Sequence, residues 1–259
     1  PGCCLDAVAS LVAAVAARDR LAPRPGRAEL AEGLTAPPVD IPRGRVLTWA
    51  ESERLLSTFD VPIVETRLVT TPDEAAAAAA DLGFPVVLKV DSPALPHRTD
   101  IGAVHVGVDS PDSARESFDA IMQAARANAP DEDIEGVLVQ PMVDDGVEAI
   151  VGVSPDEVFG SLVTVGAGGV LVEAVDDATV LVPPFSRADA REAVEAAALA
   201  DLLENRRGGD ALSVDELVDV VVTVGDLAAS TDVAELDLNP VLVTEDGPVA
   251  VDALVRTRE

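Results

Sequence analysis

The chain has 259 residues, of which 18 are Lys or Arg and 47 are Asp or Glu, so its formal net charge at pH 7 is −29. This charge argues against binding to DNA, RNA or an anionic membrane, all of which attract basic patches. Hydrophobic residues still make up 48% of the chain, which is enough for a core and excludes a disordered acidic tail.

The acidic composition, with one lysine and no tyrosine, is typical of a protein from a high-salt cytoplasm, where carboxylates hold water while salt screens their repulsion. No stretch has the apolar length of a membrane helix. The apolar residues 7–17 follow Asp6 without a basic segment, so we expect no signal peptide. Cys3 and Cys4 are adjacent and cannot link distant segments. We therefore expect a cytoplasmic protein without a disulfide framework.

The first elements differ in composition from the rest of the chain. Residues 5–20 are rich in Ala and Val at helical spacing, and residues 22–45 form a connector rich in Pro and Gly. The compact domain is expected to begin near Val46. Because the chain opens on Pro1 rather than Met, we expect it to be a fragment or a processed product.

From Val46 onward helix and strand signals alternate. Pro72 suits a first helical position, and Ser186 and Ser213 each begin a capping-box pattern. The spacing predicts helices at 49–59, 73–82, 111–128, 187–204 and 214–229. It predicts strands at 61–69, 85–90, 103–108, 136–143, 147–153, 158–165, 169–175, 178–183, 236–244 and 249–255. This order indicates an α/β or α+β fold with two lobes.

Lys89 is the only lysine of the chain and stands at the end of the apolar run 84–90. An ammonium at the end of a buried strand is costly unless an anionic group meets it. We interpret Lys89 as a phosphate or nucleotide contact. The alternative is an ordinary surface lysine.

A polar loop, residues 92–102, follows the lysine strand and carries His97 beside Arg98. Histidine titrates near neutrality and can act as a base, a ligand or a phosphoryl acceptor. A solvated loop side chain is the plainer reading of His97. The second histidine, His105, alternates with valines in a strand, and we expect a structural role for it.

Two further segments suggest contacts to phosphate and metal. Glycines cluster between two strands at 160–169, where they either let backbone amides approach a phosphate or simply form a hairpin turn. Near the C-terminus, Asp237 and Asn239 share one face of a strand, and Asp252 lies on the next strand. Such oxygen ligands suit Mg²⁺, although a solvated acidic edge would look similar.

Together these motifs resemble a known family. The residues that carry the resemblance are 83–89 (Gly-Phe-Pro-Val-Val-Leu-Lys), 92–102, 136–142 (Gly-Val-Leu-Val-Gln-Pro-Met), 165–169 and 235–240. Over about residues 46–256 the chain is similar to the ATP-grasp subunit or domain of ADP-forming acetate–CoA ligase, also called NDP-forming acyl-CoA synthetase. That enzyme is a relative of the succinyl-CoA synthetase β subunit.

The resemblance implies an ATP-grasp fold, with two lobes and the nucleotide between them. Residues 1–45 would be an N-terminal helix and linker, resembling the tail of a CoA-binding half. Residues 46–259 would form the ATP-grasp domain, with lobes at about 46–135 and 136–259. The implied partner is a CoA-binding α subunit or domain, which brings the acyl-CoA or carboxylic acid, and the assembly would be a hetero-oligomer.

The resemblance also assigns roles. In the family an acyl phosphate phosphorylates a histidine of the CoA-binding half, and a mobile segment carries that group to a second histidine, which passes it to ADP. His97 matches the second histidine, and Asp237 matches an acidic residue that steadies it. ATP or ADP would contact Lys89, Arg98, Gln140, Met142, Gly168 and Gly169. Mg²⁺ would bind Asn239 and Asp252.

Some residues depart from the family pattern. Arg98 replaces a lysine, Ala103 replaces a glycine, and Leu181 stands where a basic residue is usual. The first alternative is therefore a regulatory or scaffolding subunit that keeps the fold but binds nucleotide poorly. A second is an ATP-grasp carboxylate–amine ligase, against which the His97 loop argues.

Overall fold

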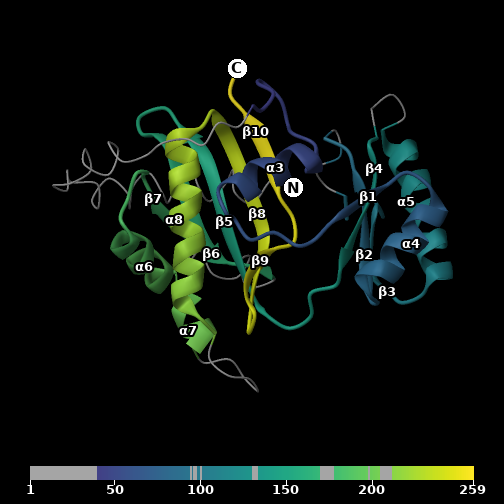
Figure 1. Cartoon of the computed structure of the whole chain (residues 1–259). Coiled ribbons are helices and arrows are strands. Elements are labelled where there is room, and N and C mark those ends of the chain that lie inside the picture. The colour runs from purple at the N-terminus through teal and green to yellow at the C-terminus, as the bar shows by residue number, and fades with distance from the viewer. Residues whose placement is uncertain are drawn as a thin grey trace. The chain divides into compact units, whose positions relative to one another are not determined.

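The computed structural model describes residues 40–93, 95, 98–99, 101–129, 134–169, 178–197, 199–204 and 212–259. In these parts of the chain helices accompany antiparallel sheets (Figure 1). None of the helices described is long and apolar enough to cross a membrane. The expected N-terminal helix at 5–20, nearly all of the connector, and His97 lie outside the described residues.

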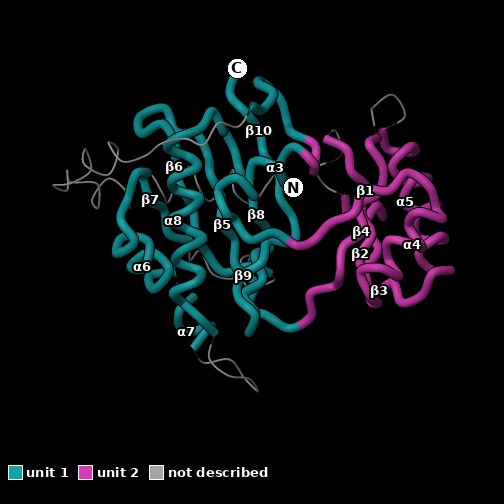
Figure 2. The backbone as a smooth tube through the Cα atoms, in the orientation of Figure 1, with its two compact units in different colours: residues 1–47, 51–63, 145–259 teal, residues 48–50, 64–144 magenta. Residues whose placement is uncertain are grey.

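The described residues form two compact units (Figure 2). Unit 2 takes residues 48–50 and 64–144, and unit 1 takes 51–63, 145–259 and the residues before 48. This division differs from the lobes expected at 46–135 and 136–259. Residues 136–141 form a strand that pairs within the sheet of unit 2. Conversely, Val46 bridges to Arg256 and Ile63 bridges to Ala250, which ties both segments to unit 1.

Unit 2 is a four-stranded antiparallel sheet in the order β1-β4-β2-β3. Its strands are β1 (Arg67–Val69), β2 (Val86–Asp91), β3 (Val104–Val108) and β4 (Gly136–Pro141), and its helices are α4 (Pro72–Leu82) and α5 (Pro111–Asn128). Val86, Leu88 and Val90 of β2 join residues of both helices in one buried core. Since side chains alternate along a strand, Lys89 and Asp91 lie on the opposite face of β2.

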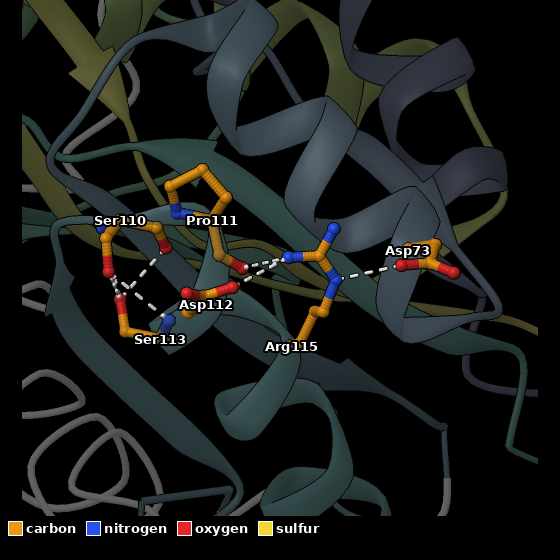
Figure 3. A network of polar contacts seen from close by, with 6 residues as sticks. All are labelled: Asp73, Ser110, Pro111, Asp112, Ser113 and Arg115. Carbon is orange, nitrogen blue, oxygen red and sulfur yellow. Dashed lines mark hydrogen bonds and ion pairs between the residues drawn. The ribbon is translucent and has the colours of Figure 1, made fainter.

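The helix starts of unit 2 follow the local sequence signals. Helix α5 begins with a capping box in which Ser110 accepts from the Ser113 N–H. Arg115, one turn further on, binds Asp112 of its own helix at 3.0 Å and Asp73 of α4 at 2.8 Å (Figure 3). Arg115 therefore links the N-terminal turns of the two helices.

Unit 1 contains a six-stranded antiparallel sheet in the order β10-β8-β5-β6-β7, with β9 also paired to β8. Its strands are β5 (Val147–Asp156), β6 (Gly160–Ala167), β7 (Ala178–Leu181), β8 (Val233–Thr244), β9 (Gly247–Ala250) and β10 (Leu254–Thr257). Its helices are α6 (Arg187–Ala196), α7 (Leu199–Glu204), α8 (Val214–Ser230) and, from its third residue, α3 (Trp49–Thr58). Helix α8 packs along β5, β6, β8 and β9.

Most expected elements are shifted at their ends by a few residues, and three are markedly shortened or divided. The strand expected at 61–69 is reduced to β1, and the helix expected at 187–204 is two helices, α6 and α7. The last strand, expected at 249–255, is interrupted. Its parts β9 and β10 pair with opposite ends of β8, on either side of Pro240. Proline has no N–H to donate to a ladder, and Asp252 lies in the break rather than on a strand. Most of the strand expected at 169–175 lies outside the described residues.

Candidate functional site

Lys89 is buried in the sheet of unit 2 and is not the surface lysine of the alternative interpretation. It lies between Leu138 of β4 and Val104 of β3, and only 4% of the residue is exposed. Its Nζ atom lies 4.8 Å from the centroid of the Trp49 ring. A buried ammonium over an aromatic face is held by the ring quadrupole.

A carboxylate accompanies this lysine. Asp91 is buried on the same face of β2, and both of its oxygens accept from the backbone N–H of Trp49, at 3.3 and 3.4 Å. Burial raises the pKa of Asp91, while that N–H and the charges of Arg98 and Lys89 act in the opposite direction. The face of β2 away from the helices thus carries a buried lysine and a buried carboxylate, both in contact with Trp49.

Two backbone hydrogen bonds join described residues between β2 and β3. The Ala103 N–H donates to the Arg98 carbonyl at 2.9 Å, and the Val90 N–H donates to the Ala103 carbonyl at 3.1 Å. His97, the expected phosphoryl acceptor, lies outside the described residues. The other histidine, His105, places Nδ1 3.0 Å from the Ser117 hydroxyl of α5, a contact in keeping with the structural role expected for it.

Gln140 and Met142 occupy the end of β4 and the residue after it. The Gln140 Nε2 donates to the Thr66 hydroxyl at 2.9 Å, and that hydroxyl donates to the Val64 carbonyl at 3.0 Å. These two consecutive hydrogen bonds fix the orientation of the Gln140 amide. The Met142 N–H donates to the Pro85 carbonyl at 3.1 Å, so the backbone N–H of Met142 is already used within unit 2.

In unit 1, Asp237 has an unusual environment. It lies in β8 between Gly152 of β5 and Leu254 of β10. Burial, and in addition the negative charge of Asp252, raise its pKa to about 6. Its Oδ1 atom is buried and has no hydrogen-bond partner among the described residues. An orphaned carboxylate oxygen is costly unless a cation or a donor meets it.

Asp237, Asn239 and Asp252 could supply a magnesium ion with only a few protein ligands. Within the described ranges no three Asp, Glu, His or Cys side chains gather closely enough to hold a metal. Asp237 and Asp252 are close enough to interact, and Asn239, exposed on β8, adds an amide oxygen. Mg²⁺ commonly takes one or two carboxylates and completes its shell with water and phosphate oxygens, so the donor chemistry suits it.

The two glycines expected to approach phosphate have a packing role that the sequence did not reveal. The Gly168 N–H donates to the Glu148 carbonyl at 2.7 Å, and a Cβ atom at Gly168 would lie 2.8 Å from the Cβ of Glu148. Gly169 has a φ of +71°, which glycine adopts readily. The close approach to β5 therefore favours glycine at 168 and the positive φ favours glycine at 169, and their contact with nucleotide stays a prediction.

Sequence reasoning missed Trp49 and Asp91. Asp91 was recognisable in principle, because it stands two residues after Lys89 on the same strand face. Trp49 was not, since its contact with β2 joins residues 42 positions apart.

The known family described as "ATP-grasp domain" matches residues 42–257. The chain belongs to the ATP-grasp family. The antiparallel sheets and accompanying helices described above confirm the fold class expected from the sequence.

The chain is homologous to the β subunit of ADP-forming acetate–CoA ligase. It is 35% identical over 210 residues to "Acetate--CoA ligase [ADP-forming] I subunit beta" of Pyrococcus furiosus, which covers 81% of this chain and 90% of that subunit.

Two solved structures of the dinucleotide forming acetyl-coenzyme A synthetase 1 of Ca. Korarchaeum cryptofilum resemble this ATP-grasp chain. One contains coenzyme A, Ca-AMPCP and HgCl⁺. It has a TM-score of 0.78 at 33% identity, covering 83% of this chain and 94% of that one. The other contains coenzyme A and Mg-AMPPCP, with a phosphohistidine segment pointing towards the nucleotide binding site. It has a TM-score of 0.70 at 31% identity, covering 83% and 93%.

Proposed function

We propose that this ATP-grasp chain is the nucleotide-binding, phosphoryl-transfer part of an ADP-forming acyl-CoA synthetase. The overall reaction converts acyl-CoA, ADP and phosphate into acid, CoA and ATP. The observation that carries the proposal is the buried Lys89, whose charge acts together with that of Arg98 on the buried Asp91, in a chain whose net charge is −29. A buried cation retained in so acidic a protein points to an anionic ligand.

The proposed chemistry is a relay through His97. The phosphoryl group leaves a phosphohistidine of the CoA-binding partner as one N–P bond breaks, and a new N–P bond forms at His97. That bond then breaks as a terminal phosphate oxygen of ADP takes the group, which yields ATP. Lys89 and Arg98 neutralise charge on the phosphates, and Asp237 steadies the imidazole. Phosphoryl transfer needs little beyond such positioning and neutralisation.

Gln140 and Met142 would border the adenine, and the amides near Gly168 and Gly169 would lie along the phosphates. A bound Mg²⁺ would neutralise phosphate oxygens, held by Asn239 and Asp252. The orphaned oxygen of Asp237 supports the role proposed for that residue beside the imidazole, because it has no donor of its own in the described part of unit 1.

The test is a labelling experiment in molar KCl. The purified chain is incubated with γ-labelled ATP and Mg²⁺, and the protein is examined for label that is acid-labile and base-stable, as phosphohistidine is. The wild type should take up label and a His97→Ala variant should not. His105→Ala is the matched control, since it removes the other histidine and should keep the label.

Equal label on wild type and His97→Ala would refute the relay. No label on either, with ATP binding confirmed by calorimetry, would mean that the histidine is not phosphorylated from ATP by this chain alone. Adding the CoA-binding partner with acyl-CoA and phosphate then decides whether His97 acts in the complete enzyme.

The alternative is a scaffolding or regulatory subunit with an impaired nucleotide site, motivated by Ala103 and Leu181. Ala103 weakens this alternative, because it is fully buried and belongs to the core of unit 2, so the loop accommodates its methyl group. Leu181, partly exposed on β7, keeps it open. Absence of both label and Mg·ADP binding would favour the alternative.

The remaining expectations are part of the same proposal. A CoA-binding α subunit or domain supplies the acyl-CoA site, and residues 1–45 resemble its tail. The shared motifs also relate the chain to the succinyl-CoA synthetase β subunit. We further propose a halophilic, cytoplasmic protein, because 47 acidic residues face only 18 basic ones and high salt would screen the repulsion.

A further inference from the structure

Trp49 is the only tryptophan of the chain, and it is packed against the proposed phosphate-binding lysine. Only 4% of Trp49 is exposed, and 4% of Lys89. Two contacts join this first residue of α3 to β2. The ring lies under the Lys89 ammonium at 4.8 Å, and the backbone N–H donates to both oxygens of Asp91.

These contacts restrict a side chain that is otherwise mobile. A lysine has a flexible four-carbon stem and loses rotamer entropy when it is ordered. An aromatic ring that attracts the ammonium, on a residue whose backbone is itself held by Asp91, limits the positions that Nζ can reach. The lysine is then ordered before an anion arrives, and preorganisation of this kind improves affinity.

We propose that Trp49 is a positioning residue for Lys89, whose ring holds the ammonium in the place where it contacts nucleotide phosphate. This rests on the proposed nucleotide contact of Lys89. The ring, rather than the indole N–H, carries the effect, since Nε1 is buried and has no hydrogen-bond partner among the described residues. A phenylalanine should therefore replace Trp49 in function, whereas an aliphatic residue should not.

The first experiment compares the affinities of Trp49→Leu, Trp49→Phe and wild type for Mg·ADP and for adenosine by calorimetry. Trp49→Leu should lose about 10-fold in Mg·ADP affinity, as expected for a desolvated cation–π contact, with adenosine affinity unchanged. Trp49→Phe should lose less than about 3-fold. All three proteins keep the backbone N–H of residue 49, from which Asp91 accepts its hydrogen bonds.

Phe118→Leu is the control for a merely structural effect, because Phe118 is buried in the core on the helix side of the same sheet. It should lower stability and leave the ratio of Mg·ADP to adenosine affinity unchanged. If the wild type binds Mg·ADP and Trp49→Leu binds it equally well, the positioning role is wrong. If Trp49→Leu loses affinity for both ligands in equal measure, the role is structural and the proposal is also overturned.

The second experiment needs no nucleotide. The fluorescence of Trp49 is compared between wild type and Lys89→Met, whose side chain has similar length and no charge. Removing the cation from the ring should change the emission intensity or the emission maximum. The control variant Arg115→Met, which removes a cation elsewhere in unit 2, should leave both unchanged. An identical spectrum in Lys89→Met would overturn the contact.

The two experiments separate the proposals. A wild type that binds no Mg·ADP but shows the Lys89-dependent emission would refute the proposed function and retain the contact between ring and ammonium. Inorganic pyrophosphate, titrated against that emission, would then decide whether the ordered lysine still meets a phosphate. If the Trp49 emission does not change when pyrophosphate is added, the positioning role is overturned.

Discussion

Asp252 opposes the ionisation of Asp237 in unit 1. Burial acts first and the charge of Asp252 adds to it, so that the pKa of Asp237 rises to about 6 from an ordinary value of 3.8. The two carboxyl groups come from β8 and from the break between β9 and β10. A site in which the ionised form of a carboxyl group is disfavoured is suited to a cation or a protonated imidazole, because either would stabilise that ionised form.

This relationship predicts how stability depends on pH. Because the folded pKa of Asp237 lies above the unfolded one, its favourable contribution is complete below about pH 4 and is lost as the pH rises through 6. Asp237→Asn should therefore be more stable than wild type at pH 7, by on the order of 2 kcal/mol, and equal to it near pH 4. Urea unfolding in 1 M KCl with EDTA, from pH 4 to 7, measures the difference.

Asp252→Asn is the matched control for this prediction. It removes the second cause of the raised pKa and leaves burial, the first cause, in place. Its gain at pH 7 should be smaller than that of Asp237→Asn. A wild type whose stability relative to Asp237→Asn does not change between pH 4 and 7 would contradict the raised pKa.

A second prediction concerns Gly168. An alanine there would place Cβ 2.8 Å from the Cβ of Glu148 and 3.0 Å from its carbonyl carbon. Because backbone cannot retreat as a side chain can, we expect Gly168→Ala to cost about 1 to 3 kcal/mol of unfolding free energy. Thermal or urea unfolding of the metal-free protein checks this.

Gly160→Ala is the comparison for Gly168, since its φ is +85° and a Cβ atom would meet nothing within 4 Å. It should cost only the strain of a left-handed conformation, roughly 1 kcal/mol. If the two variants were equally stable, the contact with Glu148 would not be the reason for glycine at position 168.

The sequence predicted those parts of the fold that are determined locally. Pro72 and Ser186 stand at the helix starts where they were expected, because capping needs only residues three or four apart. The order of strands was beyond such reasoning, since β4 joins the sheet of unit 2 through pairs with β1 and β2. This long-range pairing is why the expected lobe boundary near residue 135 differs from the observed one.

The same distinction applies to the candidate site. Lys89 and Asp237 were found because unusual residues stand in recognisable patterns, and the family resemblance supplied their roles. Neither the orphaned Oδ1 of Asp237 nor the Trp49 ring beside Lys89 could be inferred, because each depends on residues far apart in the chain. Motifs thus predicted which residues matter, and only the fold gave their environments.

A third prediction concerns Gly225, within α8. Replacing a glycine inside a helix by alanine usually adds about 1 kcal/mol of stability. Here the new Cβ would lie 2.5 Å from Cζ of Phe185 and 2.9 Å from its Cε1. We expect the overlap to outweigh the gain, so that Gly225→Ala destabilises by about 1 to 2 kcal/mol.

The double variant Gly225→Ala, Phe185→Leu tests the cause. With the ring removed, the alanine should regain its helix-forming advantage, and the double variant should be more stable than Phe185→Leu alone. Additive losses in urea unfolding would show that the ring is not responsible.

A fourth prediction concerns salt. Acidic residues outnumber basic ones by 47 to 18, so repulsion exceeds attraction over the surface. In ion pairs such as that of Arg187 with Asp215, at 2.8 Å, both side chains are exposed to solvent. Such pairs contribute little to the stability of the fold. Raising KCl from 0.1 to 2 M should therefore raise the melting temperature. An equal osmolality of glucose is the control, and a steady fall in melting temperature would contradict the proposed adaptation to salt.

The last prediction decides between the proposed function and its alternative. Leu181 is paired with Val163 at the edge strand β7 of unit 1, in the place where the resembling family usually has a basic residue. If the nucleotide site is functional but lacks one cation, Leu181→Arg should strengthen Mg·ADP binding by about 3- to 10-fold, as one charge-assisted hydrogen bond to a phosphate would do.

Leu181→Gln is the control, because it adds a polar side chain of similar reach without charge. The gain should appear for Mg·ADP and not for adenosine, and only in the arginine variant. If instead neither wild type nor Leu181→Arg binds Mg·ADP, the defect does not lie in the missing cation. The chain would then be the scaffolding subunit, and the buried Lys89 would need another anion to explain its place in the sheet.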